Sequence, residues 1–452
     1  MFSGKQLYRW PGVLLILVVM AGRILAQTHF GTATISPAFE IDGAGNDIDT
    51  ITFWEAPDPN ETLMFVSAKA SQLVEVWKVP FVNNEQEPLR HSSFGSGTRV
   101  NGVVFDQERG ELYVATSKPA STVSVFSYPG GQFVREFING ARDLRSEPNI
   151  DLYFRDNGER WAYVTADNIV YVYNGETGEE LFNFKPATSV ETVLADEFYN
   201  LLYVPDEKTH QGIFVFNPDG TPFTRNGRQN FGDEGVFQSD EEGILLYTFP
   251  ASGVGDDGSG YIVVSDQKSS ATDFEFFDRE TWEHLGSLQI DGVSNTDGIA
   301  STQRALPDYP LGLFVCINDD GTTVGVGWDA IFDATGLGDG GDGGSATAVS
   351  GLVLTAGTNA PLADATVQLQ VGAQVEYETT SNASGFYTFV NIASGAYTLF
   401  ASKDGFESWS SSIDVSDGQQ LQNRDIFLAP TVDSTPPLPP GNVRVTVDRK
   451  ND

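Results

Sequence analysis

Carboxylates are the most abundant side chains in this sequence that could take part in chemistry. Aspartate and glutamate number 62 against 26 lysines and arginines, which gives a formal net charge of −36 over 452 residues. Calcium prefers about six to eight oxygen ligands, so carboxylates gathered in one place would suit it. The same charge would also serve solubility or a saline habitat, and composition leaves both interpretations open. Because nucleic acid would be repelled, we expect no nucleic-acid partner.

Other reactive residues show no spacing typical of catalysis or metal binding. The four histidines are scattered, at His29, His91, His210 and His284. The single cysteine, Cys316, lies in an apolar stretch and is expected to be a buried small side chain. The sequence contains no Ser-His-Asp arrangement, P-loop or dinucleotide-binding fingerprint that we can identify. These observations leave the carboxylates as the main candidates.

The elements that must position such a site are β-strands in six similar stretches. Each stretch joins a short β-rich run to a second run of alternating apolar and polar residues, as at 63–77 and 161–173. Their equivalent positions, spaced by 48, 50, 40, 59 and 52 residues, are Phe65, Tyr113, Tyr163, Tyr203, Ile262 and Phe314. A period near 50 built from paired strands is typical of β-propeller blades. The expected fold is therefore all-β, a six-bladed β-propeller around a central channel, with a ligand site at one mouth.

The first 26 residues indicate an export signal. Lys5 and Arg9 precede an apolar run over 11–22, and a cleavage site fits before Gln27. The run is too short for a membrane-spanning helix. We expect a secreted or periplasmic protein, or one held at the cell surface, with no membrane span.

Beyond the signal, composition divides the chain into four segments. The propeller is expected over 27–335, a Gly/Asp-rich linker over 336–346, a small β-sandwich over 347–430 and a proline-rich tail over 431–452. The sandwich segment contains Ser-Gly-Leu-Val, Pro-Leu-Ala-Asp-Ala-Thr-Val, Ser-Gly-Phe-Tyr-Thr-Phe and Gly-Ala-Tyr-Thr-Leu. In these motifs it closely resembles the carboxypeptidase regulatory-like domain. The resemblance implies a non-catalytic spacer, which would associate the protein with a cell surface or extracellular matrix.

Three stretches of the propeller segment resemble β-propeller phytases. The most specific is 294–315, with Ser-Asn-Thr-Asp-Gly-Ile followed by Tyr-Pro-Leu-Gly-Leu-Phe-Val. The others are 47–59, with Asp-Ile-Asp-Thr-Ile-Thr-Phe-Trp and Pro-Asp-Pro, and 240–267, with Glu-Glu-Gly-Ile and Gly-Tyr-Ile-Val-Val-Ser-Asp-Gln. The match covers roughly residues 30–332. It implies a calcium-dependent phosphomonoesterase that cleaves phytate or a related small phosphoester with a metal-bound water.

The resemblance also implies roles for individual residues. The expected calcium ligands are Asp49, Glu191, Asp206, Glu207, Glu242 and Asp297. Glu191, Glu242 and Asp297 would act in catalysis, while Lys69 and Lys118 would bind substrate phosphate.

The basic residues depart from the phytase pattern. Lys118 stands in place of an arginine, and the blade-three lysine is replaced within Thr-Ala-Asp-Asn at 165–168. A propeller that has lost phosphate contacts could instead be non-catalytic and bind a ligand or a protein partner. Both hypotheses stay open at this point.

Overall fold

The structure is a computed structural model that describes residues 29–431 apart from short gaps. The gaps are 118, 120, 139–143, 145–146, 156, 187–188, 234, 250–255, 257, 339–347, 373, 382–384, 391, 417–419 and 422–423. The predicted export signal, most of the predicted linker, Lys118 and the predicted tail beyond 431 therefore lie outside the described residues. Within the described part, no helix is both long and apolar enough to cross a membrane.

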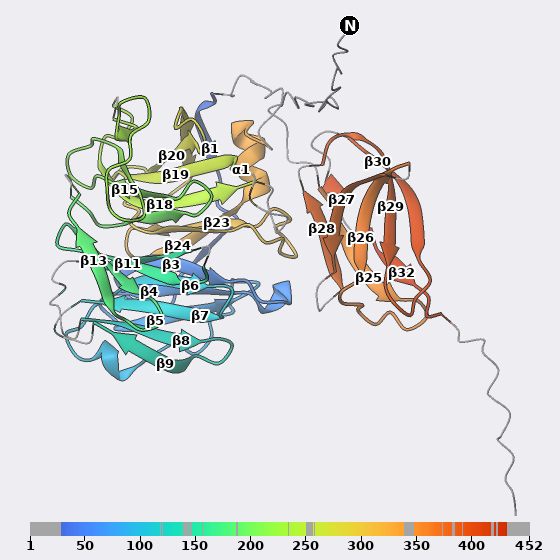
Figure 1. Cartoon of the computed structure of the whole chain (residues 1–452), viewed down its shortest axis with the longest axis horizontal. Helices are drawn as coiled ribbons and strands as arrows, with labels where there is room; N and C mark the ends of the chain where they lie inside the picture. The colour runs from blue at the N-terminus through green and yellow to red at the C-terminus, as the bar shows by residue number, and fades with distance from the viewer. Residues whose placement is uncertain are drawn as a thin grey trace, which may run out of the picture.

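Six sheets of successive strands form the blades of a propeller, which confirms the predicted fold class (Figure 1). The innermost strands, in blade order, are β3 (Ile48–Trp54), β6 (Val100–Asp106), β10 (Asn149–Phe154), β14 (Leu194–Asp196), β18 (Asp240–Thr248) and β22 (Ile299–Thr302). The second strands are β4 (Leu63–Ala68), β7 (Glu111–Thr116), β11 (Arg160–Ala166), β15 (Leu201–Pro205), β19 (Gly260–Gln267) and β23 (Leu313–Asn318). The third strands are β5 (Leu73–Lys78), β8 (Thr122–Ser127), β12 (Ile169–Asn174), β16 (Ile213–Phe216), β20 (Asp273–Asp278) and β24 (Thr322–Gly327). Blades two to five add outer strands, namely β9 (Gln132–Phe137), β13 (Glu180–Phe184), β17 (Asn230–Phe231) and β21 (His284–Ile290).

The six equivalent residues of the sequence repeat all lie in second strands. Each of them is fully buried. A strand covered on both faces reads as a continuous apolar run, and the second strands have neighbouring blades on both sides. Phe65, for example, stacks on Phe105 of the next blade with ring centroids 5.7 Å apart. The sequence repeat therefore reflects a requirement that recurs in every blade, a buried apolar side chain in the second strand that packs against a neighbouring blade.

Two strands from the start of the described chain close the ring. β1 (Gly31–Ile35) pairs in parallel with β21 of blade five, and β2 (Phe39–Ile41) pairs antiparallel with β24 of blade six. Blade one has three regular strands and two isolated bridges, Val74 to Leu89 and Trp77 to Glu85. The ring is thus held by segments that are far apart in sequence.

Around the channel, neighbouring inner strands approach so closely that some positions have no room for a side chain. A Cβ at Gly298 of blade six would lie 2.2 Å from the carbonyl oxygen of Asp49 in blade one. At Gly243 it would lie 2.7 Å from the Asp297 carbonyl oxygen, and at Gly102 it would lie 2.8 Å from Asn149 Cα. Glycine at these positions allows blades to touch through their backbones.

We expect Gly298→Ala to destabilise the propeller by about 1–3 kcal/mol, because the added methyl group must push blades six and one apart. Gly321→Ala is the matched control, since its Cβ would meet nothing closer than the Asp319 carbonyl oxygen at 3.5 Å. The thermal unfolding midpoints of the two variants measure the difference. Equal midpoints would show that the blades separate at no cost.

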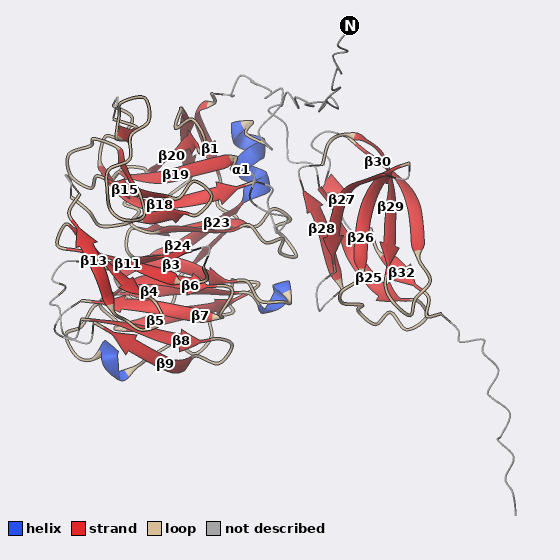
Figure 2. Ribbon diagram, viewed as in Figure 1, coloured by secondary structure: helices blue, strands red, loops and turns tan. Residues whose placement is uncertain are grey.

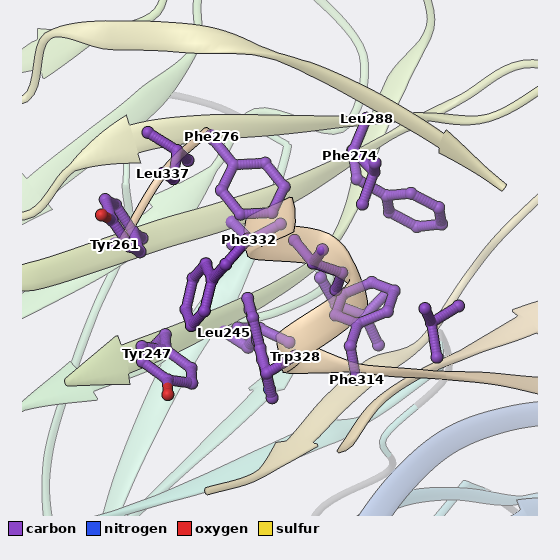
Figure 3. Packing of buried hydrophobic residues seen from close by; sticks show 14 of the residues in the cluster. Leu245, Tyr247, Tyr261, Phe274, Phe276, Leu288, Phe314, Trp328, Phe332 and Leu337 are labelled. Carbon is purple, nitrogen blue, oxygen red and sulfur yellow. The ribbon is translucent and has the colours of Figure 1, made fainter. Parts of the chain in front are cut away.

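One helix, α1 (Trp328–Thr335), seals the side of the propeller next to blades five and six (Figures 2 and 3). Trp328 is fully buried, with its ring centroid 4.3 Å from that of Tyr247, and Phe332 packs beside both. Gly336 ends the helix in the left-handed conformation and donates its N–H to the Phe332 carbonyl oxygen. Two short 3-10 helices, η1 (Pro59–Glu61) and η2 (Ser92–Phe94), complete the helical content of the described residues.

After α1 the chain forms a small β-sandwich of two sheets. One sheet contains β25 (Ala348–Thr355), β28 (Phe386–Val390), β31 (Gln420–Leu421) and β32 (Ile426–Leu428). The other contains β26 (Thr366–Val371), β27 (Gln374–Thr380), β29 (Gly395–Ser402) and β30 (Trp409–Val415). Val353, Leu369, Tyr387 and Leu399 pack between the sheets. This core contributes no residue to the site described below.

Candidate functional site

The inner strands of all six blades lie side by side and begin at the same end of the central channel. Within three residues of the start of each inner strand stands a charged residue, in blade order Asp49, Arg99, Glu147, Glu191, Glu242 and Asp297. Because second strands run antiparallel to inner strands, their ends reach this mouth too. Lys69 therefore follows β4 here, and Glu207 follows β15. We call this end, defined by Asp49, Glu147, Glu191, Glu207, Glu242 and Asp297, the carboxylate mouth.

β-bulges direct two of these carboxylates. The pairing of β3 with β4 shifts between Ile48 and Ile51, which leaves Asp49 in the bulge. The pairing of β18 with β19 shifts between Glu241 and Ile244, which does the same for Glu242. A bulge adds an unpaired residue and re-aims its side chain. These two strand irregularities thus lie at residues that form the site.

Two groups of three carboxylates meet at the carboxylate mouth and share one member. The first is Asp49, Glu147 and Glu191, and the second is Glu191, Glu207 and Glu242. In each group the candidate ligand oxygens lie within 4.8 Å of one another. Oxygen donors at this spacing fit a hard cation such as calcium, which would offset their mutual repulsion. Glu191 is positioned to serve both groups.

Burial at the carboxylate mouth disfavours the charged form of its carboxyl groups. Burial raises the pKa of Asp49 to about 6, although Lys69 opposes the shift. Burial, followed by the charge of Asp49, raises the pKa of Asp297 to about 8. Burial also raises the pKa of Glu242 to about 7 and holds that of Glu191 well above its usual range, with Glu242 next to it adding to the effect. Carboxylates in this state favour a proton or a cation close to them.

One buried lysine partly compensates this charge. Lys69 Nζ lies 3.2 Å from carboxylate oxygens of Asp297 and Glu147, and 3.5 Å from those of Asp49 and Asp47. Burial lowers the pKa of Lys69, but the four carboxylates outweigh it and the net shift is upward. Asp297 also accepts a hydrogen bond from the Gln267 side chain, so both of its oxygens are held.

Glu147 and Arg99 belong to the site although no sequence motif pointed to them. Glu147 accepts from Lys69 through Oε2 at 3.2 Å and from Arg99 through Oε1 at 2.8 Å. Asn101 donates to Asp49 Oδ2 at 3.1 Å. The available signal was positional, because each of these residues lies near the start of an inner strand. It becomes visible only once blade boundaries are known.

The predicted site residues are only partly brought together. Asp49, Glu191, Glu207, Glu242, Asp297 and Lys69 all lie at the carboxylate mouth. Asp206 belongs to no carboxylate group found in the described part of the chain. Its oxygens accept from the backbone N–H of Gln211 and the hydroxyl of Thr209, within its own turn. Metal binding by Asp206 stays a prediction, as does the role of Lys118, which the structure does not describe.

A cavity of about 410 Å³ extends from the carboxylate mouth into the channel. Asp49, Glu191, Glu242 and Asp297 line it near the mouth. Further along the inner strands it is lined by Asp151 and Glu197, whose pKa values burial raises to about 7. The carboxylate groups therefore border a cavity inside the channel.

A third carboxylate group, Asp266, Asp273 and Glu275, lies within blade five. Lys268 Nζ contacts Asp266 at 2.9 Å and also pairs with Asp273, while His284 and Ser287 contact Glu275 at 2.7 Å. Its charge is therefore met by side chains of the same blade.

Two segments of the chain match models of known protein families. Residues 154–339 match the family model "Phytase", and residues 348–429 match the model "Carboxypeptidase regulatory-like domain". A 3-phytase of Bacillus subtilis (strain 168) is 30% identical over 149 residues, which cover 31% of this chain and 36% of that protein. The match thus spans about a third of the relative's own length. The phytase model includes Glu191, Glu207, Glu242 and Asp297 but begins after Asp49, Lys69, Arg99 and Glu147.

Among solved structures, a chain of a mitotic checkpoint complex aligns with a TM-score of 0.41 at 12% identity, covering 72% of this chain and 97% of that one. The Cps50 (Swd1) β-propeller domain of Myceliophteria thermophila aligns with a TM-score of 0.40 at 11% identity, covering 64% of this chain and 99% of that one. Likenesses at these scores do not bear on the activity. The chain thus contains a segment that matches the Phytase family model, followed by one that matches the carboxypeptidase regulatory-like domain.

Proposed function

We propose that this protein is a calcium-dependent phosphomonoesterase whose active site is the carboxylate mouth. Its substrate would be phytate or another small phosphorylated molecule, and the product would be inorganic phosphate. The observation that carries the proposal is the convergence of two carboxylate groups on Glu191 at the end of an open channel. The phytase-family domain, which contains Glu191, Glu207, Glu242 and Asp297, supports the same reaction class.

The roles proposed for the residues follow from their positions. Glu191 would belong to two cation sites at once, with Asp49 and Glu147 on one side and Glu207 and Glu242 on the other. Bound calcium supplies positive charge to phosphate oxygens and lowers the pKa of a water molecule. Asp297 is fixed by Gln267 and Lys69 and presents its carboxylate to the same mouth. Lys69, to which the phytase resemblance assigns substrate binding, is paired with carboxylates of the mouth, so it would contribute positive charge beside the substrate rather than a direct hydrogen bond.

The location proposed for this activity is outside the cytoplasm. The apolar, positively charged start of the sequence supports export, and the carboxypeptidase regulatory-like domain would serve as a spacer at a cell surface or in an extracellular matrix.

Phosphate release by the purified protein tests the proposal. With millimolar calcium we expect release from phytate or from p-nitrophenyl phosphate, loss of release after chelation, and recovery when calcium is added back. Magnesium should replace calcium poorly, because it is smaller and demands octahedral geometry. A folded sample that releases no phosphate with calcium from any phosphomonoester tried would contradict the proposal. That result would favour the other hypothesis, a non-catalytic propeller that binds a ligand or a protein.

A further inference from the structure

The ammonium group of Lys69 is already paired with carboxylates of the site. Its side chain is only 5% exposed, and four carboxylates surround its ammonium group within 3.5 Å. An ammonium group has three hydrogen-bond donors, so little capacity is left for a substrate. A phosphorylated substrate at the carboxylate mouth would need another cationic side chain from the protein.

Arg99 is in the position to provide it. It precedes the inner strand of blade two, and its side chain is 44% exposed. One nitrogen, Nη2, donates to Asp47 Oδ2 at 3.0 Å and to Glu147 Oε1 at 2.8 Å. Neither Nη1 nor Nε donates a hydrogen bond to any residue that the structure describes. One corner of the guanidinium group is therefore fixed, and its other donors are available.

The hydrogen bonds of Arg99 Nη2 also determine where its Nη1 and Nε donors lie. Glu147, which holds Arg99, belongs to the first carboxylate group with Asp49 and Glu191. The guanidinium group is thus attached directly to the group proposed to bind calcium. A planar guanidinium group suits two oxygens of one phosphate, which an ammonium group does not.

From this geometry, we propose that Arg99 is a substrate-binding residue that donates hydrogen bonds to a phosphate group of the substrate at the carboxylate mouth. The inference rests on the proposed phosphomonoesterase function and adds a residue that neither the sequence motifs nor the matched family domain includes. A purely structural alternative is that Arg99 only ties Asp47 of blade one to Glu147 of blade three. The two roles predict different measurements.

The experiment compares Arg99→Gln and Arg99→Lys with the unmodified protein and with Arg155→Gln as matched control. Arg155 is 39% exposed, pairs with Glu159 and stacks on Trp161, and it follows the opposite end of β10. Each variant is first titrated with calcium, so that all later measurements are made at saturation. KM and kcat are then determined for p-nitrophenyl phosphate. The dissociation constant of inorganic phosphate is measured by calorimetry, below the solubility limit of calcium phosphate.

For Arg99→Gln we expect KM and the phosphate dissociation constant to rise roughly tenfold or more, the effect of losing a charge-assisted hydrogen bond. Arg99→Lys should recover part of this loss, because it keeps the charge without the planar geometry. Arg155→Gln should leave both constants unchanged. If Arg99→Gln lowers only the unfolding midpoint, and both constants stay the same, Arg99 is structural and the inference is wrong.

Failure of the proposed function gives a different result. If the unmodified protein releases no phosphate but binds inorganic phosphate in an Arg99-dependent way, the function is wrong and the phosphate-binding role of Arg99 stands. If the protein neither releases nor binds phosphate, both are wrong.

Discussion

Replacing Glu191 with glutamine is expected to lower kcat/KM for phosphate release by more than about a hundredfold. Glu191 is the only residue common to both carboxylate groups of the carboxylate mouth. Glutamine keeps the shape and one oxygen but removes the charge, so both proposed cation sites are weakened by a single change. Calcium titration should show a lower stoichiometry or a much lower affinity, in step with the loss of activity.

Glu197→Gln is the matched control for this experiment. Glu197 lines the same cavity and also has a raised pKa, but it belongs to neither carboxylate group of the mouth. We expect it to change calcium binding and kcat/KM little. If Glu191→Gln retains normal calcium binding and activity, the carboxylate mouth is not the active site.

Replacing Arg279 with methionine is expected to cost about 3–5 kcal/mol of unfolding free energy. Arg279 is 1% exposed and joins blades four and five. It donates to Asp196 at 2.6 and 2.8 Å and to Asp256 at 2.7 Å through two nitrogens. Without the guanidinium group, the fully buried carboxylate of Asp196 has lost the charge that compensates it.

Chemical denaturation of Arg279→Met measures this cost. Arg155→Met provides the control, because the Arg155–Glu159 pair is exposed and such pairs contribute about 1 kcal/mol or less. A loss below about 1 kcal/mol for Arg279→Met would show that water or a rearranged side chain replaces the guanidinium group.

The fold could be predicted from the sequence because the packing of the blades is repetitive. Phe65, Tyr113, Tyr163 and Tyr203 fill the same position between blades, so one steric requirement appears again and again along the chain. The pairing of β1 with β21 could not be predicted in this way. It occurs once, between segments about 250 residues apart, and leaves no periodic signal.

The candidate site was predictable to the extent that its residues lie in motifs. Asp297 and Glu242 belong to stretches that resemble phytases, and they lie at the carboxylate mouth as expected. Glu147 and Arg99 lie in connections between blades and in no recognised motif. The chain has 62 acidic and 26 basic residues, so nothing in the sequence distinguishes these two from charged residues that are simply solvated. Asp206 matches a phytase motif but does not join a carboxylate group in the described part of the chain. Its carboxylate accepts a hydrogen bond from the Gln211 backbone N–H and so stabilises the turn that follows its strand.

Closure of the ring has a consequence for how the protein is made. The strands that complete blades five and six, β1 and β2, are synthesised first, whereas their partners β21 and β24 end at Ile290 and Gly327. During translation, β1 must therefore stay unpaired until about 250 further residues have left the ribosome, and β2 until about 290 have. Contacts of such long sequence separation form slowly and leave exposed strand edges in the meantime. A chaperone that shields the nascent chain should increase the yield of folded propeller more than that of the sandwich, whose strands from β25 to β32 span only 348–428.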